Sequence, residues 1–338
     1  MPEIAPGQST EAIDRAVALL NTGALIGLPT ETVYGLAADA DNPEAVRKIF
    51  AAKGRPADHP LIVHLGAADL LPRYARDIPD VAWALAEAFW PGPLTLILKK
   101  ATGVSDTVAG GQDTVGIRIP GHPVALSLLR AFAQSRPDGG GLAAPSANRF
   151  GRISPTAAQH VADELGDAVS LILDGGDCQI GIESTIVDLS RGMPVVLRLG
   201  AISVEQLSLV LEQPIAIQGA VVSTAPRVSG SLASHYAPST PLRVVDAAVI
   251  AECLSDPGVA AIVRECPEID STIRRQPGVV VLANDPAHYA HDFYRVMREL
   301  DAVGYRQILV QTLPESTAWA AVQDRLGRAA HRDLPDNG

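Results

Sequence analysis

The stretch LPTETVYGLAAD, from Leu28 to Asp39, directly follows a short apolar run and consists largely of hydroxyl groups, one carboxylate and turn-forming residues. The apolar run, ALIGL at residues 24–28, is typical of a buried strand, and residues 11–22 before it repeat apolar side chains at helical spacing. In open α/β sheets, ligands gather outside strand ends. The stretch therefore predicts an α/β fold with a binding site where this strand ends.

The alternation of strand and helix patterns continues to about residue 211. Helical patterns occupy residues 42–52, 122–133, 155–165 and 203–211, and strand patterns occupy 61–65, 94–98, 115–119, 141–144, 171–174, 184–189 and 195–199. The short strands after residue 171 follow one another too closely for a purely parallel series. We expect a mixed, twisted sheet sandwiched by helices.

Residues 212–241 form a linker candidate, because proline, serine and glycine interrupt every period there. Beyond it, four strand patterns at 242–246, 260–263, 279–283 and 307–311 alternate with helical ones, which predicts a smaller Rossmann-like α/β domain. A chain of 338 residues is also too long for one ordinary core. We expect a domain at 1–211, a linker at 212–241 and a second domain at 242–338.

Charge and cysteine content restrict the class of protein. The formal net charge of −11 and the pI near 5.2 argue against strong direct binding of nucleic acid or an anionic membrane, both of which need a basic field. The three cysteines are widely spaced and give neither a disulfide framework nor a CxxC motif. With no long apolar segment and no signal-like start, we expect a cytoplasmic protein without a membrane span.

The familiar short catalytic motifs are missing: there is no phosphate-binding GxxxxGK[ST], no GxGxxG after a strand, no HExxH and no GxSxG. His288 and His291 lie three residues apart without a third ligand, so a solvated surface is the better interpretation than a metal site. What remains is a scattered set of cations and hydroxyls at strand ends. A single hydroxyl often only caps the backbone, and a lone arginine is often ion-paired, but together they predict one anion-binding hollow in an acidic protein.

Several segments occur in a fixed order along the chain: PTETVYGLAADA, KGRPADHPLIVH, WPGPLTLIL, DTVGIRIPGHP, AAPSANRFGRISPT, DGG with GIESTIVDL, LRLG, HYAP and DRLGRAA. In this order they resemble the YrdC/Sua5 family of threonylcarbamoyl-AMP synthases. They extend from about residue 10 to 330, so the resemblance implies the long, two-domain Sua5 form. It also implies the reaction: L-threonine, bicarbonate or CO2, and ATP give threonylcarbamoyl-AMP and pyrophosphate, the first stage of N6-threonylcarbamoyladenosine (t6A) formation in tRNA.

The resemblance assigns residues to two substrates. L-threonine is expected at Thr30, His64, Arg118 and Ser184; ATP at Lys53, Arg55, Thr114, Ser146, Asn148, Ser154, Arg198 and Tyr236, with Lys53 and Arg55 also catalytic. Tyr236, in HYAP, would belong to a lid over the nucleotide. Mg2+ is expected with ATP and no dedicated protein metal site, and the product would pass to a downstream tRNA threonylcarbamoyl transferase machinery.

One departure and two alternatives accompany this interpretation. The family usually carries a basic and aromatic run just before HYAP, whereas residues 228–234 read VSGSLAS. The same core occurs in carbamoyl-transfer proteins of hydrogenase maturation, but the cysteine clusters expected there are missing from this sequence. The second alternative is an RNA-binding YrdC-like module without synthase activity, against which the acidic balance argues.

Overall fold

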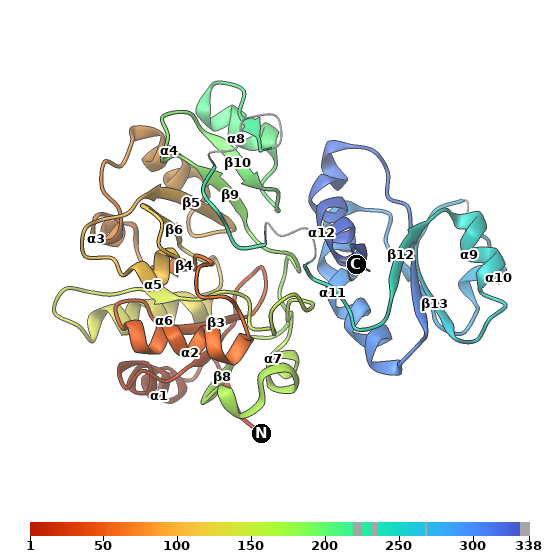
Figure 1. Cartoon of the computed structure of the whole chain (residues 1–338), viewed down its shortest axis with the longest axis horizontal. Helices are drawn as coiled ribbons and strands as arrows, with labels where there is room; N and C mark the ends of the chain where they lie inside the picture. The colour runs from red at the N-terminus through yellow and green to blue at the C-terminus, as the bar shows by residue number, and fades with distance from the viewer. Residues whose placement is uncertain (219–224, 231–234, 268, 332–338) are drawn as a thin grey trace, which may run out of the picture. The chain divides into compact units, whose positions relative to one another are not determined.

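The computed structural model describes residues 1–218, 225–230, 235–267 and 269–331. The chain divides into two compact units (Figure 1). The first contains residues 1–150, 155–179 and 183–231, and the second contains 151–154, 180–182 and 232–338. None of the helices in the described ranges combines the length and the apolarity needed to cross a membrane.

The described part of the first unit is built on one mixed sheet of eleven strands. In spatial order these are β1 (Glu3–Pro6), β8 (Leu171–Asp174), β2 (Ile26–Leu28), β3 (Gly35–Asp39), β7 (Leu142–Ala143), β4 (Ile62–His64), β6 (Thr114–Arg118), β5 (Leu94–Lys99), β9 (Thr185–Asp188), β10 (Val195–Arg198) and β11 (Ala216–Ile217). The sheet contains parallel pairs, such as β4 with β6, and antiparallel pairs, such as β5 with β6. The mixed sheet expected from the sequence is confirmed.

Helices cover this sheet on both faces. They are α1 (Thr10–Asn21), α2 (Pro43–Lys53), α3 (Leu71–Tyr74), α4 (Asp80–Phe89), α5 (Asp106–Ala109), α6 (Pro123–Gln134), α7 (Ala158–Leu165) and α8 (Val204–Leu211), with 3-10 turns at Ala68–Leu70 and Gly166–Ala168. Their starts follow local chemistry. The Asn42 side chain accepts hydrogen bonds from the backbone of Glu44 and Ala45, and Pro43 occupies the first turn, where no N–H is needed.

Alternation of side chains along the strands divides the core between the two faces. Odd positions of β6, such as Val115 and Ile117, join the cluster under α2, α4, α7 and α8. On the opposite face, α1 and α6 cover β1, β8, β2 and β3 through residues such as Leu20 and Leu128. Over β5, β9 and β10, the apolar side chains of that opposite face pack with Val228 and Ala225, from the segment 225–230.

The second unit contains a parallel sheet in the order β12 (Leu242–Val245), β15 (Gln307–Gln311), β13 (Val259–Arg264) and β14 (Val279–Leu282). Parallel neighbours need crossover connections, and α9 (Ala247–Cys253), α10 (Ser271–Arg274) and α11 (Pro286–Val303) supply them. A 3-10 turn (Thr317–Trp319) and α12 (Ala320–Ala330) complete the unit (Figure 1). The smaller Rossmann-like α/β unit expected from the sequence is confirmed.

Three strands, β1, β3 and β11, have no counterpart in the sequence-based expectation, and β11 lies in the range 212–241 that was expected to be a linker. β1 is four residues long with three exposed side chains, so its composition carries no apolar alternation, and it is recognised only by its parallel pairing with β8. β3 occupies the second half of the LPTETVYGLAAD stretch and returns antiparallel to β2. Residues 29–34 are therefore the loop between two paired strands, which fixes both ends of the polar segment.

Candidate active site

The candidate site lies on the sheet face that carries the even-numbered side chains of β6. Four neighbouring strands place an apolar group there, formed by Ile62 on β4, Gly116 on β6, Ile97 on β5 and Ile186 on β9. Two positions away lie His64 on β4, Arg118 on β6, Thr95 on β5, and Ser184 directly before β9. Since side chains two residues apart point to the same face, the apolar group and the polar group adjoin.

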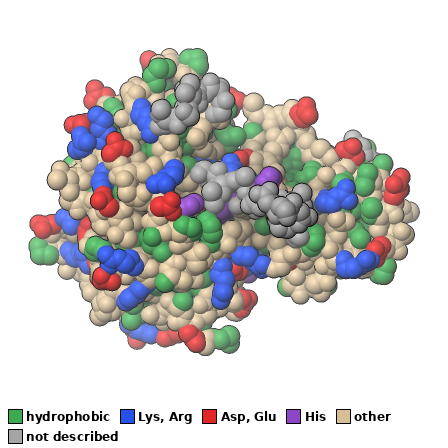
Figure 2. Space-filling model, viewed as in Figure 1, with side chains coloured by type: hydrophobic (Ala, Val, Ile, Leu, Met, Phe, Trp, Pro, Cys, Tyr) green, Lys and Arg blue, Asp and Glu red, His purple; other side chains and the backbone are tan. Residues whose placement is uncertain are grey.

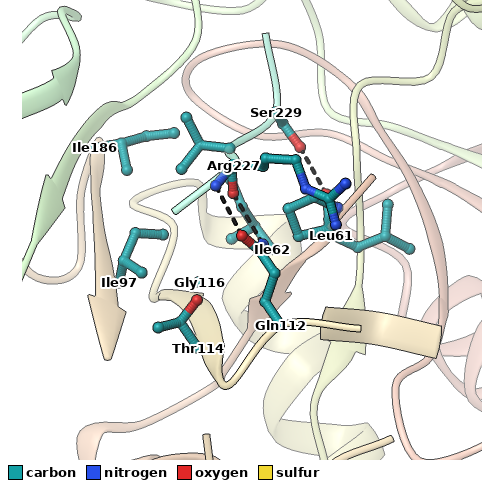
Figure 3. Close-up of a pocket in the computed structure, with 11 residues that line it drawn as sticks. Leu61, Ile62, Ile97, Gln112, Thr114, Gly116, Ile186, Arg227 and Ser229 are labelled. Atoms are coloured by element: carbon teal, nitrogen blue, oxygen red, sulfur yellow. Dashed lines mark hydrogen bonds between the residues drawn. The ribbon is translucent and has the colours of Figure 1, made fainter. Parts of the chain in front are cut away.

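The apolar group lines an open hollow, shown in Figure 3. Thr114 contributes a hydroxyl at its lower edge, and Arg227, Val228 and Ser229 cross it from the segment 225–230. This segment is fastened by its backbone, because the Gln112 side chain accepts a hydrogen bond from the Arg227 N–H at 2.8 Å and donates one to the Arg227 carbonyl at 3.1 Å.

His64 and Arg118 are register partners on the parallel strands β4 and β6, and both are buried. His64 Nδ1 lies 3.2 Å from the Ile62 carbonyl oxygen, which can only accept, so Nδ1 carries the proton and Nε2 keeps its lone pair. Burial, and after it the neighbouring Arg118 guanidinium, lower the pKa of His64 to about 3. The imidazole is therefore neutral at physiological pH.

Arg118 forms a buried ion pair with Glu31, with Nη2 and Oε1 2.7 Å apart and side chains only 5% and 7% exposed. The other carboxylate oxygen of Glu31, Oε2, is buried and accepts no hydrogen bond from any residue that the structure describes. A buried acceptor without a donor typically costs about 1–3 kcal/mol, and more for a charged group. Beside it, the Thr30 hydroxyl donates to the Val33 carbonyl at 2.6 Å and shapes the loop that carries Glu31.

Ser184, Arg198 and Arg55 are joined by the segment that crosses the hollow. Arg198 donates from Nε to the Ser184 carbonyl at 3.0 Å, from Nη2 to the Ser184 hydroxyl at 3.1 Å, and from Nη1 to the Ser229 carbonyl at 2.8 Å. Arg55 donates to the Ser229 hydroxyl at 3.1 Å. The Ser184 hydroxyl also lies 2.8 Å from that of Thr95. Arg55 and Arg198 thus both donate hydrogen bonds to Ser229, a serine of the linker.

Lys53 is the last residue of α2 and is held by the loop that follows β7. Its ammonium donates to the carbonyl of Ser146 at 2.5 Å and to that of Asn148. Burial first, and then the nearby Arg55 charge, hold the pKa of Lys53 well below its usual range. Gly54, in the left-handed conformation at φ 60°, ends the helix and turns the chain so that Arg55 follows directly.

Ten of the expected residues belong to the first unit: Thr30, Lys53, Arg55, His64, Thr114, Arg118, Ser146, Asn148, Ser184 and Arg198. Ser154 and Tyr236 belong to the second unit. There Tyr236 stacks on Tyr294, with ring centroids 5.7 Å apart, and lies under the Arg325 guanidinium. Residues 231–234 of the VSGSLAS stretch lie outside the described residues. The substrate contacts of all twelve remain predictions.

Sequence reasoning gave no role to Glu31 or Thr95. Glu31 lies in the stretch LPTETVYGLAAD, but its partner Arg118 is 87 positions away, and no local sequence pattern predicts that contact. Thr95 appeared only as an interior residue of an apolar strand. The available signal for Glu31 was a carboxylate among hydroxyl-bearing residues. For Thr95 it was a hydroxyl inside an otherwise apolar strand.

Among the described residues, no group of three or more His, Cys, Asp or Glu side chains could hold a metal ion. His288 and His291 instead each lie against a neighbouring aspartate, Asp285 and Asp292. The charged and titratable groups of the site are the buried Arg118–Glu31 pair, the neutral His64 imidazole, and a second cluster of Lys53, Arg55 and Arg198.

Comparisons with known proteins identify the family of the chain. The Sua5/YciO/YrdC family model, described as "Telomere recombination", matches residues 18–200, and the model described as "Threonylcarbamoyl-AMP synthase, C-terminal domain" matches residues 202–331. A threonylcarbamoyl-AMP synthase of Pyrococcus abyssi is 37% identical over 93% of each chain. That of Bacillus subtilis is 36% identical over 94% of this chain and 92% of its own.

Solved structures extend the likeness to three dimensions. The crystal structure of P. abyssi Sua5 complexed with L-threonine is 36% identical, with a TM-score of 0.86 over 98% of this chain and 97% of that chain. The structure of a P. abyssi Sua5 double variant gives a TM-score of 0.85 at 35% identity. The chain therefore belongs to the Sua5/YrdC family, in its two-domain Sua5 form.

Proposed function

We infer that this chain is a threonylcarbamoyl-AMP synthase, a nucleotidyltransferase that joins L-threonine, bicarbonate or CO2, and ATP into threonylcarbamoyl-AMP and pyrophosphate. The observation that carries the inference is the face on which His64, Arg118 and Ser184 adjoin the cluster of Arg55 and Arg198. It supplies an amino-acid pocket next to an anion pocket. Relatives named for this activity match along nearly the whole chain.

In the proposed arrangement, L-threonine lies between Thr30, His64, Arg118 and Ser184. A guanidinium offers a planar fork for a carboxylate, so Arg118 binds the carboxylate of the amino acid. The neutral His64 keeps an acceptor nitrogen, and Ser184 supplies a hydroxyl; both suit the polar groups of a small substrate. The buried position of all four excludes water from the reacting amine.

ATP occupies the remaining part of the face. Lys53 and Arg55 meet its phosphates, and Thr114, Ser146, Asn148 and Arg198 line the rest. The nucleotide contacts expected of Ser154 and Tyr236 stay predictions. The Ser229 hydroxyl and carbonyl now hold Arg55 and Arg198, so phosphate oxygens replace a linker serine on these two guanidiniums. Charge-assisted bonds to phosphate are stronger than those to a neutral hydroxyl, which favours the exchange.

The proposed reaction needs no side-chain nucleophile. The carbamate of threonine attacks the α-phosphate of ATP, and pyrophosphate leaves, so alignment and charge neutralisation account for the rate. Mg2+ belongs to the proposal as the counter-ion of ATP. Magnesium usually keeps several waters and takes phosphate oxygens, which fits a described chain without a carboxylate cluster.

The domain roles, location and partners complete the proposal. Residues 1–211 form the catalytic domain, 212–241 the linker and lid, and 242–338 the Sua5-type C-terminal domain. The three cysteines are free, as a reducing cytoplasm would keep them. The product serves t6A formation through a tRNA threonylcarbamoyl transferase machinery.

The alternative, an RNA-binding module without synthase activity, has less support. Acidic and basic side chains are interspersed on the face shown in Figure 2, and the chain carries a formal charge of −11. RNA binding of useful strength needs a concentrated basic surface.

The direct test incubates the purified chain with ATP, Mg2+, L-threonine and labelled bicarbonate. We expect label in an adenylate together with released pyrophosphate, both dependent on threonine. Hydrolysis of ATP to ADP without threonine dependence would contradict the proposal. A salt-sensitive RNA complex without ATP consumption would support the alternative.

A further inference from the structure

Glu31 is a buried carboxylate whose surroundings leave one oxygen unused. Oε1 is taken by Arg118, while Oε2 has no donor among the described residues. Arg118 is oriented further by the Gly92 carbonyl, which accepts from Nε at 3.3 Å. A carboxylate that only had to hold Arg118 in place could present both oxygens to its fork. The single contact leaves Oε2 of Glu31 available to a further hydrogen-bond donor.

None of the described groups around Glu31 donates a hydrogen bond to Oε2. His122, at the start of α6, accepts a hydrogen bond from the Val124 N–H at Nδ1, so its proton is on Nε2, 3.3 Å from the Gly175 carbonyl. Cys178 has a buried thiol, and burial together with the Glu31 charge raise its pKa, so it stays protonated and uncharged. Arg118, and beyond it the neutral His64, are the further titratable groups on this side.

We propose that Glu31 Oε2 receives the α-ammonium of the substrate L-threonine and accepts its proton. The inference rests on the proposed function and deepens it. A threonine zwitterion carries a negative carboxylate and a positive ammonium. The Arg118–Glu31 pair offers a positive group to the first and a negative group to the second. With the carboxylate on Arg118 and the ammonium on Glu31, four charges alternate and the buried site stays neutral overall.

The proton transfer is needed because an ammonium has no lone pair. Glu31 takes one proton, leaving the free amine and a neutral carboxylic acid. The amine nitrogen then forms a C–N bond with bicarbonate, the C–OH bond breaks, and the hydroxyl leaves as water with a second proton from nitrogen. The carbamate carries a new negative charge. A protonated Glu31 does not repel it, whereas a carboxylate would.

The test compares two ligands that differ only at the proposed contact: L-threonine, and 2,3-dihydroxybutyrate of the same configuration, which replaces the ammonium by a hydroxyl. Calorimetry gives both dissociation constants for the wild type and for Glu31→Gln. We expect the variant to bind threonine at least tenfold more weakly while the hydroxy acid changes less than threefold. Equal losses for both ligands would show that Glu31 only positions Arg118, and would overturn the proposal.

Asp39→Asn is the matched control, because Asp39 is another buried carboxylate of the same unit and is paired with Arg136. It should leave the ratio of the two dissociation constants unchanged. Each ratio comes from one protein preparation, so a fraction of unfolded protein cancels. If Glu31→Gln does not fold, Glu31→Asp takes its place, with a shorter carboxylate and the same expected direction.

A pH series tests the proton transfer separately. In Glu31→Gln, threonine-dependent pyrophosphate release should approach the wild-type rate as the pH rises and more threonine enters as free amine. A loss of equal size at every pH would contradict the transfer. The wild-type assay with labelled bicarbonate reports the synthase function independently, so a failure of the Glu31 inference and a failure of the proposed function give different results.

Discussion

Replacing His64 by asparagine should change how the stability of the first unit depends on pH. The folded protein holds the pKa of His64 at about 3, whereas a histidine in an unfolded chain titrates near its ordinary value. Between these two values the unfolded state binds the extra proton, so acid favours unfolding. The contribution of His64 is fully present above the unfolded pKa and is lost as the pH falls through the window below it.

The size of this change in unfolding free energy follows from proton linkage. Lowering the pH from about 7 to about 5 costs about 2 kcal/mol of unfolding free energy for one such histidine, and the figure hardly changes while the folded pKa stays below about 4. His59 and His122 also have lowered pKa values, so the wild type has a steeper total slope. Asparagine keeps an N–H donor for the Ile62 carbonyl and removes the titration of His64 alone.

The assay is urea unfolding at several pH values in this range, followed by tryptophan fluorescence. Trp83 and Trp90 belong to the first unit and Trp319 to the second, so a Trp319→Phe background restricts the signal to the first. We expect the wild type to lose about 2 kcal/mol more than His64→Asn between about pH 7 and pH 5. Parallel pH curves for the two proteins would refute the claim that His64 is buried and neutral beside Arg118.

Four further variants probe other parts of the site. Lys53→Ala or Arg55→Ala should lower turnover at least tenfold, about 1.4 kcal/mol of transition-state stabilisation, and unchanged steady-state kinetics in both would remove them from the site. Arg118→Lys loses the planar fork, so the KM for threonine should rise severalfold more than that for ATP; equal changes would argue against carboxylate binding. Gly200→Ala would bring a Cβ within 2.4 Å of the Thr185 nitrogen and displace the segment bearing Ser184, so thermal unfolding should shift several degrees lower, with an unshifted midpoint as the contrary result.

The sequence predicted the strands of the site best where apolar residues alternate. In VGIRIP the alternation places Ile117 opposite Arg118, and the structure buries Ile117 in the core under the helices while Arg118 faces the other way. The family resemblance then assigned the residues, because segments far apart in the chain share no local pattern.

What could not be predicted are contacts over long separations. Glu31 meets Arg118 across 87 positions, and Ser229 meets Arg55 across 174. Such pairs depend on strand order, and the order here inserts β7 between β3 and β4 although β7 comes much later in the chain. The serine that holds two arginines also lies in a segment whose composition indicates only a linker.

A crystal structure of this chain grown with L-threonine tests the central claim most directly, namely that Thr30, Glu31, His64, Arg118 and Ser184 surround one amino-acid pocket. We predict threonine on this face of the sheet, with its carboxylate on Arg118 and its amino group on Glu31. Threonine bound elsewhere, or these side chains without contact to it in a crystal that contains it, would contradict the account.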